Sequence, residues 1–177
     1  MAIQIGAKPD SGFDNPLGML QDCHRRIERF LHILCTVAAQ ASGRSLNSEE
    51  TDAVTAALHY FQEGGRRHNA DEEESLFPRL RAAESGSSLA DLAHLEDDHR
   101  RTEQLHHQVE ALYRHWIEPS ALSPAEQTQL LSATADLQRI YTAHIHLEES
   151  TVFPHAAQVL APDAIAAIGS EFQARRK

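Results

Sequence analysis

Two pairs of matching segments decide the fold. Residues 22–32 read DCHRRIERFLH and residues 97–107 read DDHRRTEQLHH, with six of the eleven positions identical at an offset of 75. Residues 68–78 read HNADEEESLFP and residues 144–154 read HIHLEESTVFP, at an offset of 76. The chain therefore contains two similar halves, and each half supplies one histidine from its first segment and His-x-x-x-Glu from its second.

Helix-start signals flank these segments. They are Asn15-Pro16, Asn47 with Glu50, Ser88 with Asp91, and Ser123-Pro124 with Glu126. The sequence predicts helices over about 16–41, 47–83, 88–116 and 124–160, followed by a short helix from Pro162. The pair Gly64-Gly65 should bend or loosen the second helix, and the second half has Ile140 and Tyr141 at these positions.

Four long helices joined by short turns predict an all-α fold, an antiparallel up-down four-helix bundle made of two pseudo-symmetric hairpins. Residues 1–14 lack apolar periodicity, and we expect a loose N-terminal arm there. Residues 15–177 then form one domain, because no linker divides them.

The composition narrows the possible partners. A formal net charge of −10 argues against nucleic acid, and no apolar stretch is long enough to span a membrane. The N-terminus does not resemble a secretory signal, so we expect a cytoplasmic protein. Cys23 and Cys35 stand 12 residues apart on one predicted helix, too far to form a disulfide.

The histidine spacing predicts a metal site. Positions four apart lie about one turn apart on the same side of a helix, so each His-x-x-x-Glu motif directs an imidazole and a carboxylate into one volume. A carboxylate has two oxygens and can bridge two cations, with histidines on the outer positions. The predicted ligands are His24, His68, Glu72, His99, His144 and Glu148. This nitrogen and oxygen set suits iron best, with manganese or zinc as alternatives.

With this pattern, the chain resembles the hemerythrin-like family, in the branch called the HHE cation-binding domain, over about residues 16–160. The resemblance implies a non-heme diiron centre of two Fe ions. It also implies that Glu72 and Glu148 bridge the irons together with an oxo, hydroxo or water ligand. Oxygen-carrying hemerythrins have a fifth histidine, in a His-x-x-x-His motif on the third helix, where this chain has Glu103.

Several neighbouring side chains have two interpretations. Glu28 and Glu103 lie four residues after His24 and His99, so each is either a further ligand or the partner of a nearby arginine. Tyr141 and His106 lie on the same faces as His144 and His99, and each is either a hydrogen-bonding group near the metals or an ordinary packed or surface residue.

The remaining acids beside the motifs have one interpretation. We expect a solvated face at Asp71, Glu73, Glu74 and Glu149.

The sequence leaves three functions open and does not decide whether the chain is an enzyme. The first is a diiron protein that binds or senses O₂, NO or a related small oxidant. The second is a diiron peroxidase or catalase-like enzyme acting on peroxide. The third is iron handling, including repair of iron–sulfur clusters.

Overall fold

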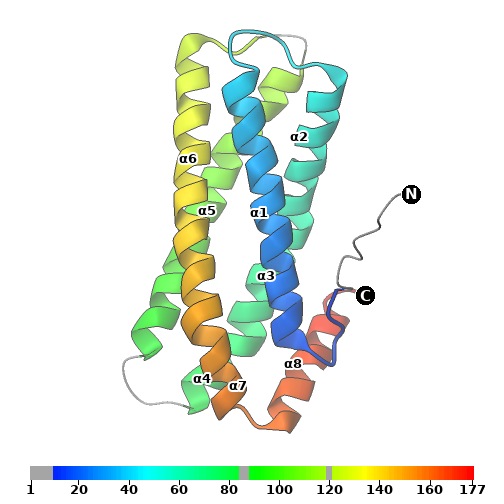
Figure 1. Cartoon of the computed structure of the whole chain (residues 1–177), viewed down its shortest axis with the longest axis vertical. Helices are drawn as coiled ribbons and strands as arrows, with labels where there is room; N and C mark the ends of the chain where they lie inside the picture. The colour runs from blue at the N-terminus through cyan, green and yellow to red at the C-terminus, as the bar shows by residue number, and fades with distance from the viewer. Residues whose placement is uncertain (1–9, 84–87, 119–120) are drawn as a thin grey trace, which may run out of the picture.

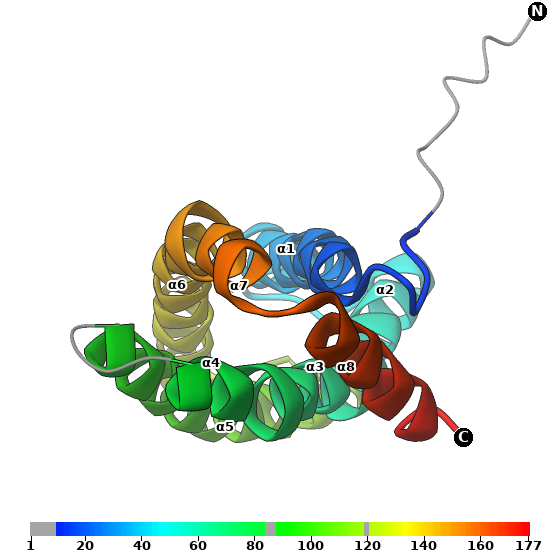
Figure 2. The same cartoon turned by 90° about the horizontal axis from the view of Figure 1, so that it is seen from below.

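The computed structural model describes residues 10–83, 88–118 and 121–177, with the side chains of 88 and 89 left out. In these ranges the chain is helical and has no β-strand. The helices follow one another in four columns along the chain. Figure 1 shows the columns side by side, and Figure 2 shows them around a common interior. The all-α bundle predicted from the sequence is confirmed.

The first column is α1 (Pro16–Gln40) and the third is α5 (Ser88–Ile117). The second column is the continuous run α2 (Ser48–Tyr60), η1 (Phe61–Gly65), α3 (Arg66–Asp71), η2 (Glu72–Leu76) and α4 (Phe77–Ala83). The fourth column is α6 (Pro124–Leu147), η3 (Glu148–Val152) and α7 (Phe153–Val159), and α8 (Pro162–Ala174) follows. None of the described helices combines the length and apolar character needed to cross a bilayer.

Three of the predicted helix starts are confirmed. The Asn15 side chain accepts a hydrogen bond from the Gly18 backbone N–H, with Pro16 in the first turn. Complete capping boxes open α2 at Asn47 and α6 at Ser123, where the cap side chain and the glutamate at N3 bond reciprocally to the backbone. The predicted cap by Ser88 lies outside the described side chains.

Two π-helical segments begin at the two predicted bridging glutamates. In η2 the Phe77 N–H donates to the Glu72 carbonyl, and in η3 the Phe153 N–H donates to the Glu148 carbonyl. Each segment is followed by a proline, whose ring cannot follow a regular α-helix without meeting the carbonyl four residues earlier. The wider turn relieves that clash without ending the helix. The third π segment, η1, contains Gly64-Gly65 and has no counterpart in the regular α6.

Buried apolar side chains form two clusters, one toward each end of the bundle. The first includes Leu34, Leu130 and Trp116, and the second includes Leu20, Phe77 and the α8 residue Phe172. On every column the predicted metal ligands lie between residues of the first cluster and residues of the second. A polar layer therefore divides the apolar interior.

Helix α8 closes one end of the bundle, where it packs on α1, α3 and η2 (Figure 2). Its arginines reach the buried carboxylate of Asp71, with Arg175 Nη1 at 2.6 Å from Oδ1 and Arg176 Nη2 at 2.5 Å from Oδ2. Asp71 was predicted to lie on a solvated face, and that was wrong, because these two arginines replace the water around its charge.

Residues 10–14 of the predicted loose arm make contacts with the bundle. The Ser11 N–H donates to Asp22 at 2.6 Å, and Phe13 packs against the second cluster. Residues 1–9 of the arm lie outside the described residues.

The approach of Phe13 to α8 depends on Gly169. A Cβ at Gly169 would lie 1.9 Å from the Phe13 carbonyl oxygen, so an alanine there must displace the 10–14 segment. We expect Gly169→Ala to lower the free energy of unfolding by about 1–3 kcal/mol, and to speed proteolysis before residue 16. Thermal unfolding and limited proteolysis measure this, with the exposed Ser170→Ala as the control. Equal behaviour of the two variants would contradict this packing.

Candidate metal centre

The six predicted ligands come together in the middle of the bundle. His24 comes from α1, His68 and Glu72 from the second column, His99 from α5, and His144 and Glu148 from the fourth column. All six are buried, and both glutamates are 0% exposed. His24, His99 and His144 each share one face of their helix with apolar residues three or four positions away, such as Ile27 after His24. Because burial of these apolar residues turns that face inward, these histidines also lie inside the bundle.

These side chains form two groups of four, and both groups contain Glu72 and Glu148. His24 and His68 complete the first group, while His99 and His144 complete the second. In each group the potential ligand atoms lie within 4.8 Å of one another. Two adjacent cations can therefore share the two carboxylates.

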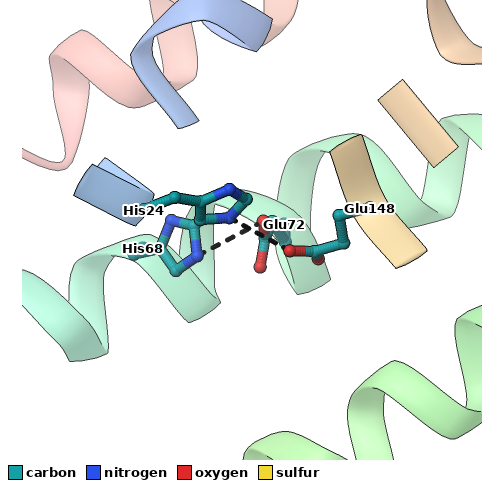
Figure 3. Close-up of side chains that lie close together, drawn as sticks. All are labelled: His24, His68, Glu72 and Glu148. Atoms are coloured by element: carbon teal, nitrogen blue, oxygen red, sulfur yellow. Dashed lines mark ion pairs between the residues drawn. The ribbon is translucent and has the colours of Figure 1, made fainter. Parts of the chain in front are cut away.

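The two oxygens of each glutamate face different histidines. Glu148 Oε2 lies 3.0 Å from His24 Nε2, whereas its Oε1 lies 3.3 Å from His144 Nε2. Glu72 Oε1 lies 3.5 Å from His68 Nε2, and its Oε2 lies 3.4 Å from His99 Nε2. Figure 3 shows the first group, with the two imidazoles directed toward the carboxylates from the opposite side. This is the arrangement expected of two bridging carboxylates.

The carboxylate oxygens fit metal ions better than they fit the protein alone. All four oxygens of Glu72 and Glu148 are buried and accept no hydrogen bond from the described residues. A buried carboxylate without a donor or cation is costly, so such groups are normally paired or coordinate metals. The donor set of imidazole nitrogen and carboxylate oxygen suits iron, manganese or zinc.

The two carboxyl groups differ in the metal-free chain. Burial raises the pKa of Glu72 well above its usual range, and the negative charge of Glu148 adds to the shift. Burial acts in the same direction on Glu148, but the neighbouring His144 and His24 together outweigh it and hold the pKa of Glu148 well below its usual range. Divalent cations would stabilise both carboxylates in the charged form.

Carboxylates also meet the outer nitrogens of three histidines. His24 Nδ1 lies 2.9 Å from Glu149 Oε1, and His99 Nδ1 lies 2.7 Å from Glu73 Oε1. His144 Nδ1 lies 3.7 Å from Asp98 Oδ2. A carboxylate at Nδ1 accepts the proton of that nitrogen and fixes the orientation of the ring, so that Nε2 would be the nitrogen available to a metal ion.

Sequence reasoning missed the role of Glu73 and Glu149, which were predicted to face solvent. Each of these two acids comes directly after a predicted bridging glutamate in the sequence. Successive residues of a helix are about 100° apart around its axis, so the acid was expected to point away from the site. Each instead reaches the histidine of the adjacent column. The sequence does contain an indication of this role, because the two acids occupy equivalent positions of the repeat, as the predicted ligands do.

Glu28 and Glu103 belong to neither group of ligands. The Glu28 side chain is 56% exposed and lies 3.8 Å from Arg25. Of the two interpretations given from the sequence, Glu28 therefore matches the partner of a nearby arginine and not a further ligand. Glu103 is exposed and lies on a cavity between α5 and the second column.

That cavity has a volume of about 760 Å³ and reaches His99. Tyr141 and His106 lie on its wall, and the Tyr141 hydroxyl is 3.0 Å from His106 Nε2. Burial lowers the pKa of His106 to about 4, so this histidine is neutral near pH 7. Tyr141 is buried and its hydroxyl is satisfied by His106, which is the packed-core alternative given for this residue from the sequence.

Metal removal should destabilise the fold, because it leaves the buried carboxylates without cations. Binding at 100 times Kd contributes about 2.7 kcal/mol per ion, and 1 kcal/mol shifts Tm by roughly 2–4 °C at this chain length. We therefore expect chelation of one ion to lower Tm by roughly 5–10 °C. Calorimetry before and after chelation measures this, and Glu72→Ala, which has lost a shared ligand, is the control that should not respond. An unchanged Tm would show that the site does not couple metal to stability.

Loss of either outer carboxylate should weaken one cation more than the other. We expect Glu149→Gln to lower the affinity of the His24–His68 position, and Glu73→Gln that of the His99–His144 position, by about 10–100-fold. The metal-loaded protein is titrated with a coloured chelator until both ions are released, and the titration curve gives the affinity of each of the two metal positions. Glu28→Gln on the exposed face is the matched control, and equal effects of all three substitutions would contradict the assignment.

The comparisons with known proteins agree with this geometry. The family model described as Hemerythrin HHE cation binding domain matches residues 15–156. None of the curated proteins and none of the solved structures matches the chain at a significant level. The match covers most of the chain and contains all six side chains of the two groups. The chain therefore belongs to the hemerythrin HHE cation-binding domain family.

Proposed function

We propose that the protein holds two non-heme irons and binds or senses a small oxidant, O₂ or NO. The observation that carries the proposal is the sharing of Glu72 and Glu148 between two pairs of buried histidines. When bound, a pair of irons supplies redox electrons and a coordination position for a diatomic molecule. Manganese and zinc fit the same donor atoms. Of these three metals, iron is the one best suited to the redox-linked binding of O₂ or NO that we propose.

The residues of the chain would perform three tasks at this centre. Glu72 and Glu148 hold the two cations together, and their charge offsets part of the four positive charges of two divalent ions. Glu73, Glu149 and Asp98 orient three of the histidines and add negative charge outside the ligands. The apolar clusters on both sides exclude bulk water, which strengthens the electrostatic interactions within the layer.

The ligand set favours an open coordination position. Each group offers two imidazoles and one oxygen from each of two carboxylates, so these residues would supply four ligand atoms to each cation. The third-helix position of the fifth histidine is occupied by the exposed Glu103, which belongs to neither group. A small molecule therefore has room to bind without displacing a protein ligand.

A second function, peroxide removal, is favoured by one observation. The Tyr141 hydroxyl and His106 form a hydrogen-bonded pair on a cavity that also reaches His99. The Tyr141 hydroxyl and His106 are hydrogen-bonding groups that could hold a peroxide within the cavity that reaches His99.

Absorption titration of the reduced, iron-loaded protein tests the proposal. We expect O₂ and NO each to produce a new near-ultraviolet or visible band that saturates at one molecule per iron pair. Glu72→Ala, which removes a shared ligand, should abolish the band. A stable protein that binds two irons and gives no adduct with either gas would refute the proposal. Release of O₂ from added peroxide that is lost in Glu72→Ala would then support the enzyme instead.

A further inference from the structure

The two sides of the metal centre differ, although the repeat relates them. On the side of His24, the first and fourth columns pack closely against each other, and their residues Ile27, Leu31, Leu137 and Ile145 are buried. On the side of His99, the equivalent groove between the third and second columns contains the cavity of about 760 Å³.

The cavity exists because particular residues break the repeat. Gly65 stands where the second half has Tyr141, and Asn69 stands where it has Ile145. On the third column, Thr102 and His106 stand where the first column has Ile27 and Leu31. These four cavity-lining residues replace three branched apolar side chains and one aromatic side chain with smaller or more polar groups.

Gly65 lines the cavity and contributes no side chain to it. Its backbone is helical, and an added Cβ would meet only the Phe61 ring, at 3.5 Å. Glycine is therefore not needed there for backbone conformation, and a larger side chain fits the helix. Glycine inside a helix costs about 1 kcal/mol relative to alanine. The absence of a side chain at this position is what leaves the groove open.

The charge around the cavity indicates what it admits. Five glutamates and two arginines line it: Glu63, Glu73, Glu74, Glu103 and Glu110, with Arg66 and Arg100. Three of these glutamates pair with arginines outside the lining, namely Glu63 with Arg67, Glu74 with Arg175 and Glu110 with Arg114. The lining nevertheless belongs to a chain of formal net charge −10, and this negative charge repels anions and does not act on uncharged molecules. Deeper in the cavity, the Tyr141 hydroxyl and Thr102 are hydrogen-bonding groups.

We propose that this cavity is an access route for small uncharged molecules, that it leads to the His99–His144 side of the centre, and that it disfavours anions. The identity of the small molecule rests on the proposed function, whereas the route itself rests on the cavity and on the broken repeat. The absence of the side chain at Gly65 keeps the route open.

A thiol-accessibility experiment tests the route without reference to bound gas. Thr102→Cys places a reporter thiol on the inner part of the cavity, at a position that is 3% exposed. In the full-length, metal-loaded variant, we expect neutral methyl methanethiosulfonate to label the introduced thiol about tenfold faster than an anionic sulfonatoethyl analogue. Mass spectrometry separates this label from the native Cys23 and Cys35.

Narrowing the cavity should slow the same labelling. We expect Gly65→Leu to reduce the rate roughly tenfold and Gly65→Ala to have a smaller effect. The matched control is Ala56→Leu, an exposed position on α2 that does not line the cavity. Equal labelling rates with and without Gly65→Leu, or faster labelling by the anion, would overturn the proposal.

Gas-binding kinetics provide an independent measurement. Narrowing a route slows entry and exit alike, so Gly65→Leu should lower the association and dissociation rates of NO by similar factors and leave its Kd unchanged. A changed Kd with an unchanged association rate would overturn the route. If the unsubstituted protein binds no NO at all, the proposed function fails, and the labelling result still decides the route.

Discussion

The structure depends on two buried glutamate carboxyl groups to which the described residues donate no hydrogen bond. Glu72 and Glu148 lie fully inside the bundle, with four oxygens that accept no hydrogen bond from the described residues. The histidine pairs on both sides and the outer carboxylates on three of those histidines are the features that a pair of cations at this place would require. An apolar core alone would need none of these features.

Much of the fold and of the ligand set could be predicted from the sequence because both depend on local periodicity. Helical spacing places His68 with Glu72 and His144 with Glu148, and the capping residues Asn47 and Ser123 mark helix starts by short-range hydrogen bonds. The repeat then shows that two such hairpins meet. These features require no knowledge of how the helices are rotated against one another.

The features that could not be predicted depend on contacts between columns. Glu149 reaches His24 across 125 residues, and Asp71 is neutralised by arginines of α8 more than 100 residues away. The cavity beside His99 results from the combined size of side chains on three columns, which spacing along one helix does not reveal. Each of these contacts depends on how neighbouring helices are rotated about their own axes and on how closely they approach each other.

The polar layer between the two apolar clusters also bears on how the protein unfolds. Each cluster is continuous within itself, and between them lies the layer of histidines and glutamates that could hold cations. In a metal-free chain, burial of the Glu72 and Glu148 carboxyl groups without cations destabilises this layer, whereas both clusters keep their own contacts. The two ends of the bundle can then unfold as separate cooperative units. Bound ions would couple the two ends, so that the whole bundle unfolds in one transition.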